Sequence, residues 1–161
     1  SGDLKLYLTG GASNSDAILS LGGTTSSVLF TDATLQNLFA NVTPAEAVAG
    51  SIKYRALSFK NTSAFTAYAA VVYISQETTS ADTTIALAYD STGTQSVVNE
   101  NTAPSGPTLT FTTPLNLGSG ISLGDVAAAG VRRIWFRRTV TAGAAQASDS
   151  GKITINVGSS P

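Results

Sequence analysis

Apolar and polar residues alternate along several short stretches of the chain, and this period of two residues predicts β-strands. In "DLKLYLT", Leu4, Leu6 and Leu8 share one face of a half-buried strand, and "KITINV" repeats the pattern near the other end of the chain. Roughly eight short strands separated by turns indicate an all-β fold, a single antiparallel β-sandwich of the immunoglobulin-like or jelly-roll type. The expected strands are residues 4–9, 26–30, 51–61, 64–75, 82–90, 131–140 and 152–157, with shorter ones around 97–98 and 108–112.

Residues 17–50 are expected to form a long decorated connection with one or two short helical turns. Within it, "TPAEAVAG" carries the pattern of a short helix, since Thr43 can cap the N-terminus, Pro44 suits the first helical position and Glu46 completes a capping box. A second helical turn is expected in "TDATLQNLF", residues 31–39. No repeat divides the sequence, so the expectation is one β-sandwich domain over residues 1–161.

Two further expectations concern apolar side chains. Ile18, Leu19 and Leu21 are expected to tuck the connection against the core. Residues 64–75 are apolar on both faces, which indicates either a central strand or a strand with one face against a partner. The tripeptide "NTS" just before them predicts a tight turn, and with it a hairpin of strands 51–61 and 64–75.

The stretch "VRRIWFRRTV", Val131 to Val140, holds four of the nine basic residues around the only tryptophan. On a pleated strand, Ile134 and Phe136 would enter the core, whereas Arg133, Trp135 and Arg137 would share the outer face, with the arginines along the indole ring. This pattern is typical of a structural strand. The alternative is a protein interface formed by Arg133, Trp135 and Arg137, because Arg and Trp are common interface anchors.

Charge argues against nucleic acid or membrane as a partner. The formal net charge is -1, only 12% of residues are charged, and no apolar run is long enough to cross a membrane. The chain has no Cys and no His, which removes thiolate chemistry and the commonest general base and metal ligand. No enzyme, cofactor or metal site is therefore expected.

The carboxylates are scattered, and Asp82 and Asp90, at opposite ends of one expected strand, would lie roughly 26 Å apart, too far for a catalytic pair. A loop calcium site near Asp90 or Asp149 is the metal-binding alternative.

Four stretches, taken in order, are similar to a family of small structural proteins of tailed bacteriophages. They are "LYLTGGASNSDAILSLGG", "YRALSFKNTS", "VVNENTAPSG" and "LGDVAAAGVRRIWFRRTVTAGAAQASDSGKITINV". The family's YR, KN, NE-TAP and W-RR positions correspond here to Tyr54-Arg55, Lys60-Asn61, Asn99-Glu100 with Thr102 to Pro104, and Trp135 with Arg137-Arg138. The sequence departs from the family at Ala56 and in the "AAAG" corner, residues 127–130.

This resemblance implies a virion protein without enzymatic activity. The leading expectation is a capsid decoration, or cement, protein on the outer surface of the head, made in the host cytoplasm, whose partner is the major capsid protein. Homo-oligomerisation is compatible with that role. The alternatives are a tail, neck or fibre-associated adaptor, and a carbohydrate-binding β-sandwich module that uses the surface aromatics Tyr54, Tyr68, Tyr73 and Trp135.

Overall fold

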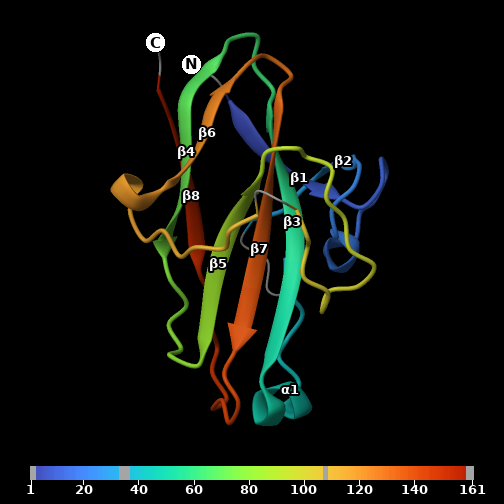
Figure 1. Cartoon of the computed structure of the whole chain (residues 1–161), viewed down its shortest axis with the longest axis vertical. Helices are drawn as coiled ribbons and strands as arrows, with labels where there is room; N and C mark the ends of the chain where they lie inside the picture. The colour runs from blue at the N-terminus through green and yellow to red at the C-terminus, as the bar shows by residue number, and fades with distance from the viewer. Residues whose placement is uncertain (1–2, 33–36, 107–108, 159–161) are drawn as a thin grey trace.

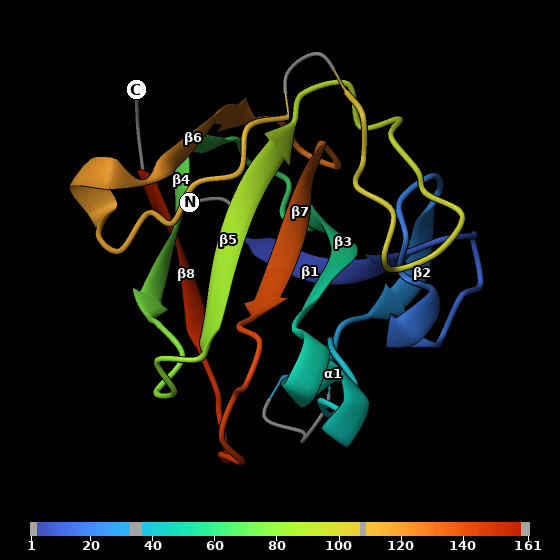
Figure 2. The same cartoon turned by 60° about the horizontal axis from the view of Figure 1, so that its bottom comes forward.

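Strand pairing divides the chain into two antiparallel sheets in the computed structural model, which describes residues 3–32, 37–106 and 109–158. The larger sheet has the strand order β2-β1-β3-β7-β5, and the smaller has the order β6-β4-β8. Figures 1 and 2 show the smaller sheet set against one side of the larger one. The predicted all-β, sandwich-like fold is therefore confirmed. The strands are β1 (Leu4–Thr9), β2 (Thr25–Leu29), β3 (Ser51–Asn61), β4 (Ala67–Gln76), β5 (Thr83–Asp90), β6 (Ile121–Val126), β7 (Val131–Val140) and β8 (Lys152–Gly158).

The main apolar core lies between the two sheets and follows the predicted alternation. Ile134 and Phe136 of β7 are buried in it, as expected, and Leu57 of β3 and Leu87 of β5 lie beside them on the same face. Val72 of the smaller sheet is fully buried against them. Each such side chain removed from water contributes roughly 1.5–3 kcal/mol, so this layer is the main source of stability.

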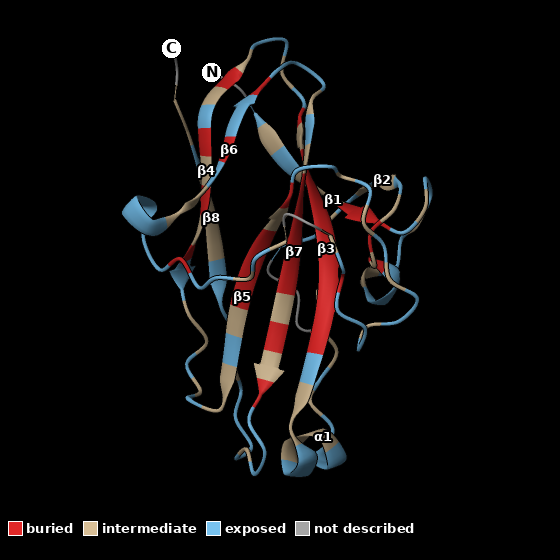
Figure 3. Ribbon diagram, viewed as in Figure 1, coloured by how far each residue is buried: buried red, intermediate tan, exposed pale blue. Residues whose placement is uncertain are grey.

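The central strands of the larger sheet are buried on both faces. In β3, every residue from Lys53 to Phe59 is buried, and in β7 the same holds from Arg133 to Phe136. Figure 3 shows this burial along β3 and β7. The second buried face arises because the long connection between β5 and β6 crosses it and packs Val97, Leu109 and Phe111 onto it. The sheet therefore carries a second, smaller apolar cluster on its outer side.

The connection from residue 17 to residue 50 contains a strand as well as short helical turns. Helix α1 (Pro44–Ala49) has the predicted capping box, in which the Glu46 side chain accepts from the Thr43 backbone N–H at 2.8 Å. A 3-10 turn, η1 (Ala17–Leu19), precedes β2, which pairs with β1. The helical turn predicted for residues 31–39 falls partly on residues 33–36, outside the described residues. The predicted tuck is wrong at its first two positions, because Ile18 and Leu19 are 49% and 56% exposed.

The predicted hairpin of β3 and β4 is also wrong. β3 pairs with β1 and β7, whereas β4 pairs with β6 and β8, so the chain crosses from one sheet to the other after residue 61. The physical reason is the fully buried Asn61, whose Nδ2 donates to the carbonyls of Phe65 and Val126, both at 2.8 Å. These bonds turn the chain away from β3 instead of folding it back.

Of the two alternatives for the two-faced apolar stretch, the structure has the central strand, because β4 lies between β6 and β8. Ala69 has a positive φ of 46°, and the register shifts there so that Ala67 and Ala70 both face inward. The expected short strand at 97–98 is a loop, and so are residues 109–112 of the other one, whose residue 108 lies outside the described residues. A 3-10 turn, η2 (Leu117–Ser119), follows before β6. None of the helices in the described ranges is long and apolar enough to span a membrane.

Candidate functional site

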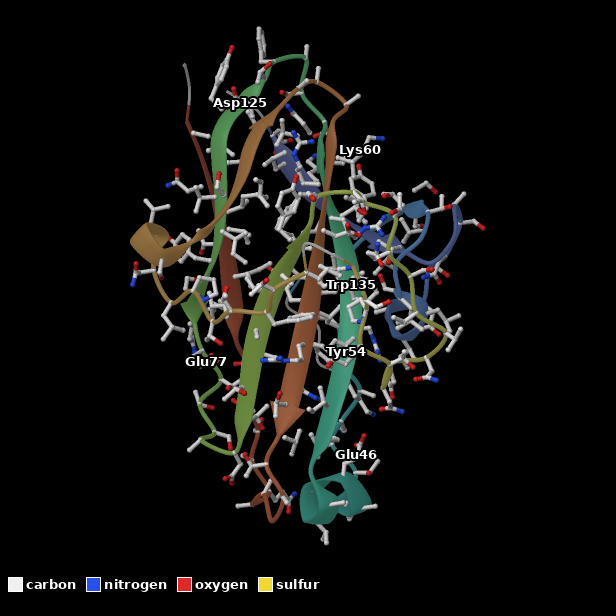
Figure 4. The ribbon with its side chains drawn as sticks, in the orientation of Figure 1. Glu46, Tyr54, Lys60, Glu77, Asp125 and Trp135 are labelled. Atoms are coloured by element: carbon white, nitrogen blue, oxygen red, sulfur yellow. The ribbon has the colours of Figure 1, made fainter. Side chains whose placement is uncertain are left out.

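Trp135 is the centre of the second apolar cluster. As predicted, it lies on the face of β7 opposite Ile134 and Phe136, but that face is not open to solvent, and Trp135 is 0% exposed. Tyr54, Ala56 and Ala88 surround it within the sheet. Figure 4 shows Trp135 and Tyr54 on neighbouring strands beneath the covering loop.

The backbone of Gly22 lies close to the indole of Trp135. Its φ is +90°, and a Cβ at this position would lie 2.7 Å from Cζ2 of Trp135. Only glycine therefore lets the backbone of the long connection approach the ring so closely. Trp135 is held by contacts from three separate parts of the chain, which is the environment of a core residue.

Arg133 is also buried, at 3% exposure, and its guanidinium joins three segments. Its Nε donates to Ser58 Oγ at 3.0 Å, and its Nη2 donates to the Gly23 carbonyl at 2.6 Å. Burial lowers the pKa of Arg133, and the nearby carboxylate of Asp90 opposes that shift. Asp90 itself has a lowered pKa, because hydrogen bonds from Thr92, Gln95 and Gly93 outweigh the effect of its burial. Arg133 thus links β7 by hydrogen bonds to β3 and to the loop before β2.

Arg137 stacks on a different ring from the one expected. Its guanidinium carbon lies 5.1 Å from the centre of the Phe111 ring, and Phe111 makes an edge contact with Tyr54 at a ring-centre distance of 5.6 Å. The predicted arrangement of arginines along the Trp135 ring is therefore wrong, because loop side chains occupy that face. Of the three candidate interface residues, Trp135 is fully buried, Arg133 is 3% exposed and Arg137 is half-buried.

A buried network of charges, which sequence reasoning missed, lies on the inner face of β3. Arg55 is 0% exposed and forms an ion pair with Glu100. Lys53 bridges two carboxylates, with Nζ 2.5 Å from Glu46 and 2.8 Å from Glu100. Helix α1, strand β3 and the long β5–β6 connection are joined by these contacts. The positions are far apart in sequence, so no local pattern marks them.

Burial and pairing act against each other on these charges. Burial alone would raise the pKa of Glu46 and of Glu100, but hydrogen bonds and charges of their partners lower both below the usual value. The pKa of Lys53 is correspondingly raised, since its two carboxylates outweigh its burial. All three groups are therefore charged at neutral pH.

The Phe39 ring lies against both Arg55 and Arg138 and so links Arg138 of β7 to the charge network. The guanidinium carbons of Arg55 and Arg138 lie 5.4 Å and 5.0 Å from the centre of its ring. Arg138 also donates to the Ala40 carbonyl at 2.7 Å, so its side chain fastens the segment that precedes α1. The charge network holds separate parts of the chain together, and its carboxylates, Glu46 and Glu100, are paired with the side chains of Lys53 and Arg55.

Two shallow hollows lie beside these clusters. One, of about 370 Å³, is lined by hydroxyl groups and by Asp90 and Arg133. The other, of about 440 Å³, lies between residues 10–11 and residues 96–97 and is lined by Gly10, Leu19 and Val97 among others. Among the described residues no three His, Cys, Asp or Glu side chains come together as metal ligands.

The aromatics proposed for a glycan platform do not share one accessible surface. Tyr54 is 8% exposed and Trp135 is 0% exposed, whereas Tyr68 and Tyr73 of β4 belong to the smaller sheet. The two buried rings are unavailable for stacking on a sugar.

No family model matches the chain, and no curated protein or solved structure matches it.

Proposed function

We propose that this protein is a non-enzymatic structural component of a tailed-bacteriophage virion, which decorates the outer surface of the head by binding the major capsid protein. The similarity of the four sequence stretches to small phage structural proteins supports this proposal. In the fold, those stretches supply most of β1, β3, β6, β7 and β8, and the loop residues 10–23 and 97–106.

The observation that carries the proposal is a set of exposed apolar side chains on two loops that are joined to each other by backbone hydrogen bonds. We call it the loop patch and define it as Ile18, Leu19 and Val98, which are 49%, 56% and 91% exposed. The two loops that supply it are joined by backbone hydrogen bonds, including Val97 N–H to the Leu21 carbonyl at 3.0 Å. Exposed apolar groups on a rigid framework favour protein contact, because little order is lost on binding.

The state of the carboxylates supports a role without catalysis. Glu46 and Glu100 are neutralised by Lys53 and Arg55, and Asp90 accepts four hydrogen bonds from its own loop. A general acid or base needs a free lone pair or proton within reach of a substrate. The lone pairs of these three carboxylates are already engaged by hydrogen bonds and cations of the chain itself.

Within the sandwich class we favour an immunoglobulin-like arrangement over a jelly roll. A jelly roll divides its strands into two similar sheets built from Greek keys, whereas here the division is five and three. Because the smaller sheet is narrower than the larger one, loops form part of the surface at the sides of the sandwich. Such loops could contact several shell subunits at once. Repetition over the symmetric shell would then add avidity to contacts that are individually weak.

The direct test is to mix the purified protein with phage heads that lack it. We expect near-stoichiometric coating of the heads, and a loss of coating with Leu19→Asp or Val98→Asp, which place a charge in the loop patch. Val48→Asp is the matched control, because Val48 is 75% exposed on α1, away from the patch. Binding to isolated tails with no binding to heads would support the adaptor function and contradict this proposal.

A further inference from the structure

The four edge strands of the two sheets differ in whether their outer backbone groups find hydrogen-bond partners. Beyond β5, the backbone of Leu87 exchanges hydrogen bonds of 2.8 Å and 2.9 Å with Thr112. Beyond β6, the carbonyls of Leu123 and Asp125 accept from the guanidinium of Arg132 at 2.9 Å and 2.5 Å. Beyond β2, the Ser27 N–H donates to the Ala12 carbonyl at 2.9 Å. Each of these edges is closed by a loop or a side chain.

The edge of β8 is different. Within the described ranges, its backbone pairs with β4, and no backbone hydrogen bond joins it to another segment. Ile153, Ile155 and Val157 pack against the core from this strand but remain only half-buried. A strand edge that has no partner among the described residues is a template for a further strand, and natural proteins usually protect such edges with charges, proline or a covering segment. Lys152, at the first position, is the one charge in β8.

We infer that β8 is a self-association strand, and that two copies of the chain pair antiparallel through it about a two-fold axis at Ile155. The pattern of β8 is self-complementary about that residue: Ile153 would face Val157 of the second copy, and Thr154 would face Asn156. Apolar residues thus meet apolar ones on the inner face, and polar residues meet on the outer face. A two-fold interface requires this match of a surface with itself.

The charge and the length of β8 also suit pairing with a second copy of the chain. Lys152 would face Gly158 of the second copy, so no like charges oppose one another across the axis. Seven paired residues make a seam about 23 Å long, which joins two three-stranded sheets into one of six. A single strand pair buries less surface than a permanent dimer usually does, so the association is concentration-dependent.

The outward-facing pair Thr154 and Asn156 provides the test. The register places Thr154 opposite Tyr73 and Asn156 opposite Val71 of β4, while Ile155 lies opposite the buried Val72, so both polar side chains lie on the outer face. The double variant T154K/N156K puts like charges opposite each other across the axis. The matched variant T154K/N156E, at the same positions, puts opposite charges there. Sedimentation over a wide concentration range reads out the mass.

We expect the unmodified protein to move from the 16.3 kDa chain toward twice that mass as concentration rises. T154K/N156K should weaken the dimer at least about tenfold, while T154K/N156E should restore it, with strengths that fall as salt is added. A single-chain mass for the unmodified protein at all concentrations would overturn the inference. Equal weakening by both variants would also overturn it.

Cross-linking gives an independent readout, because the chain has no cysteine of its own. In Ile155→Cys the two introduced thiols would face each other at the axis and form a disulfide-linked dimer on mild oxidation. Ile121→Cys is the control, since it lies on β6 in the same sheet, away from the β8 edge. Equal dimer yields from both variants would show random collision and contradict pairing through β8.

Discussion

Arg55 and Glu100 form a buried ion pair although they are 45 positions apart in the chain. The Arg55 side chain is 0% exposed and that of Glu100 is 24% exposed. The backbones meet as well, since the Tyr54 N–H donates to the Glu100 carbonyl at 2.8 Å. This contact fastens the start of the long β5–β6 connection to β3, and the same connection covers Trp135 further along.

Removing the Glu100 charge is expected to destabilise the protein markedly. Glu100→Gln leaves Arg55 buried without its counter-ion, and breaking a buried pair from one side costs roughly 3 kcal/mol. The free energy of unfolding, measured with urea, checks this. Asp3→Asn is the control, because the Lys5 and Asp3 side chains of that ion pair are 50% and 58% exposed and its loss should change stability by less than about 1 kcal/mol. Similar effects of the two variants would contradict a structural role for the buried pair.

Acid is expected to destabilise the protein through Glu46 and Glu100. Their pKa values in the folded chain lie below the ordinary value of 4.5, so the unfolded chain binds more protons at low pH. Their contribution to stability is complete above about pH 4.5 and is lost as pH falls through the folded-state pKa values. Unfolding free energies between about pH 3 and pH 7 should show this slope. The E46Q/E100Q variant should show a shallower one, whereas parallel curves would contradict the assignment.

Trp135 is expected to act through stability. Trp135→Ala empties a fully buried site and should lower the free energy of unfolding by about 4 kcal/mol. The single tryptophan should also emit at short wavelength in the native state and shift to longer wavelength on unfolding. Val98→Ala, at a 91% exposed position, should change stability by less than about 0.5 kcal/mol. Full stability of Trp135→Ala would show that the ring does not pack inside.

Local patterns predicted the parts of the fold that local physics controls. The alternation placed Ile134 and Phe136 in the core, and the Thr43–Glu46 spacing predicted the capping box of α1. The same alternation assigned Trp135 to the other face of β7 but carried no information about what covers that face. Burial of Trp135 depends on Phe111 and its neighbours, which belong to a loop without a periodic pattern.

The charge network and the sheet crossing were missed for a related reason. Lys53 and Glu100 are brought together only by the folding of the β5–β6 connection, and their spacing carries no motif. The tripeptide "NTS" that begins at Asn61 has the composition of a tight turn. The side-chain amide of Asn61, however, donates to the carbonyl of Val126, 65 residues further along the chain. The choice between a hairpin and a crossing is made by that distant carbonyl.

A matched pair of glycine substitutions tests how the long connection is fitted to the Trp135 cluster. Gly22 and Gly11 both have positive φ, +90° and +138°, so alanine is strained at either position. At Gly22 the added Cβ would also collide with the Gln95 carbonyl oxygen and approach the Trp135 ring to 2.7 Å, whereas at Gly11 no atom lies within 4 Å. We expect Gly11→Ala to cost about 1 kcal/mol and Gly22→Ala about 3 kcal/mol, because overpacking adds to backbone strain. Thermal unfolding monitored by Trp135 fluorescence measures both effects. Equal losses would mean that backbone strain alone, rather than close packing against the indole, accounts for the glycine at position 22.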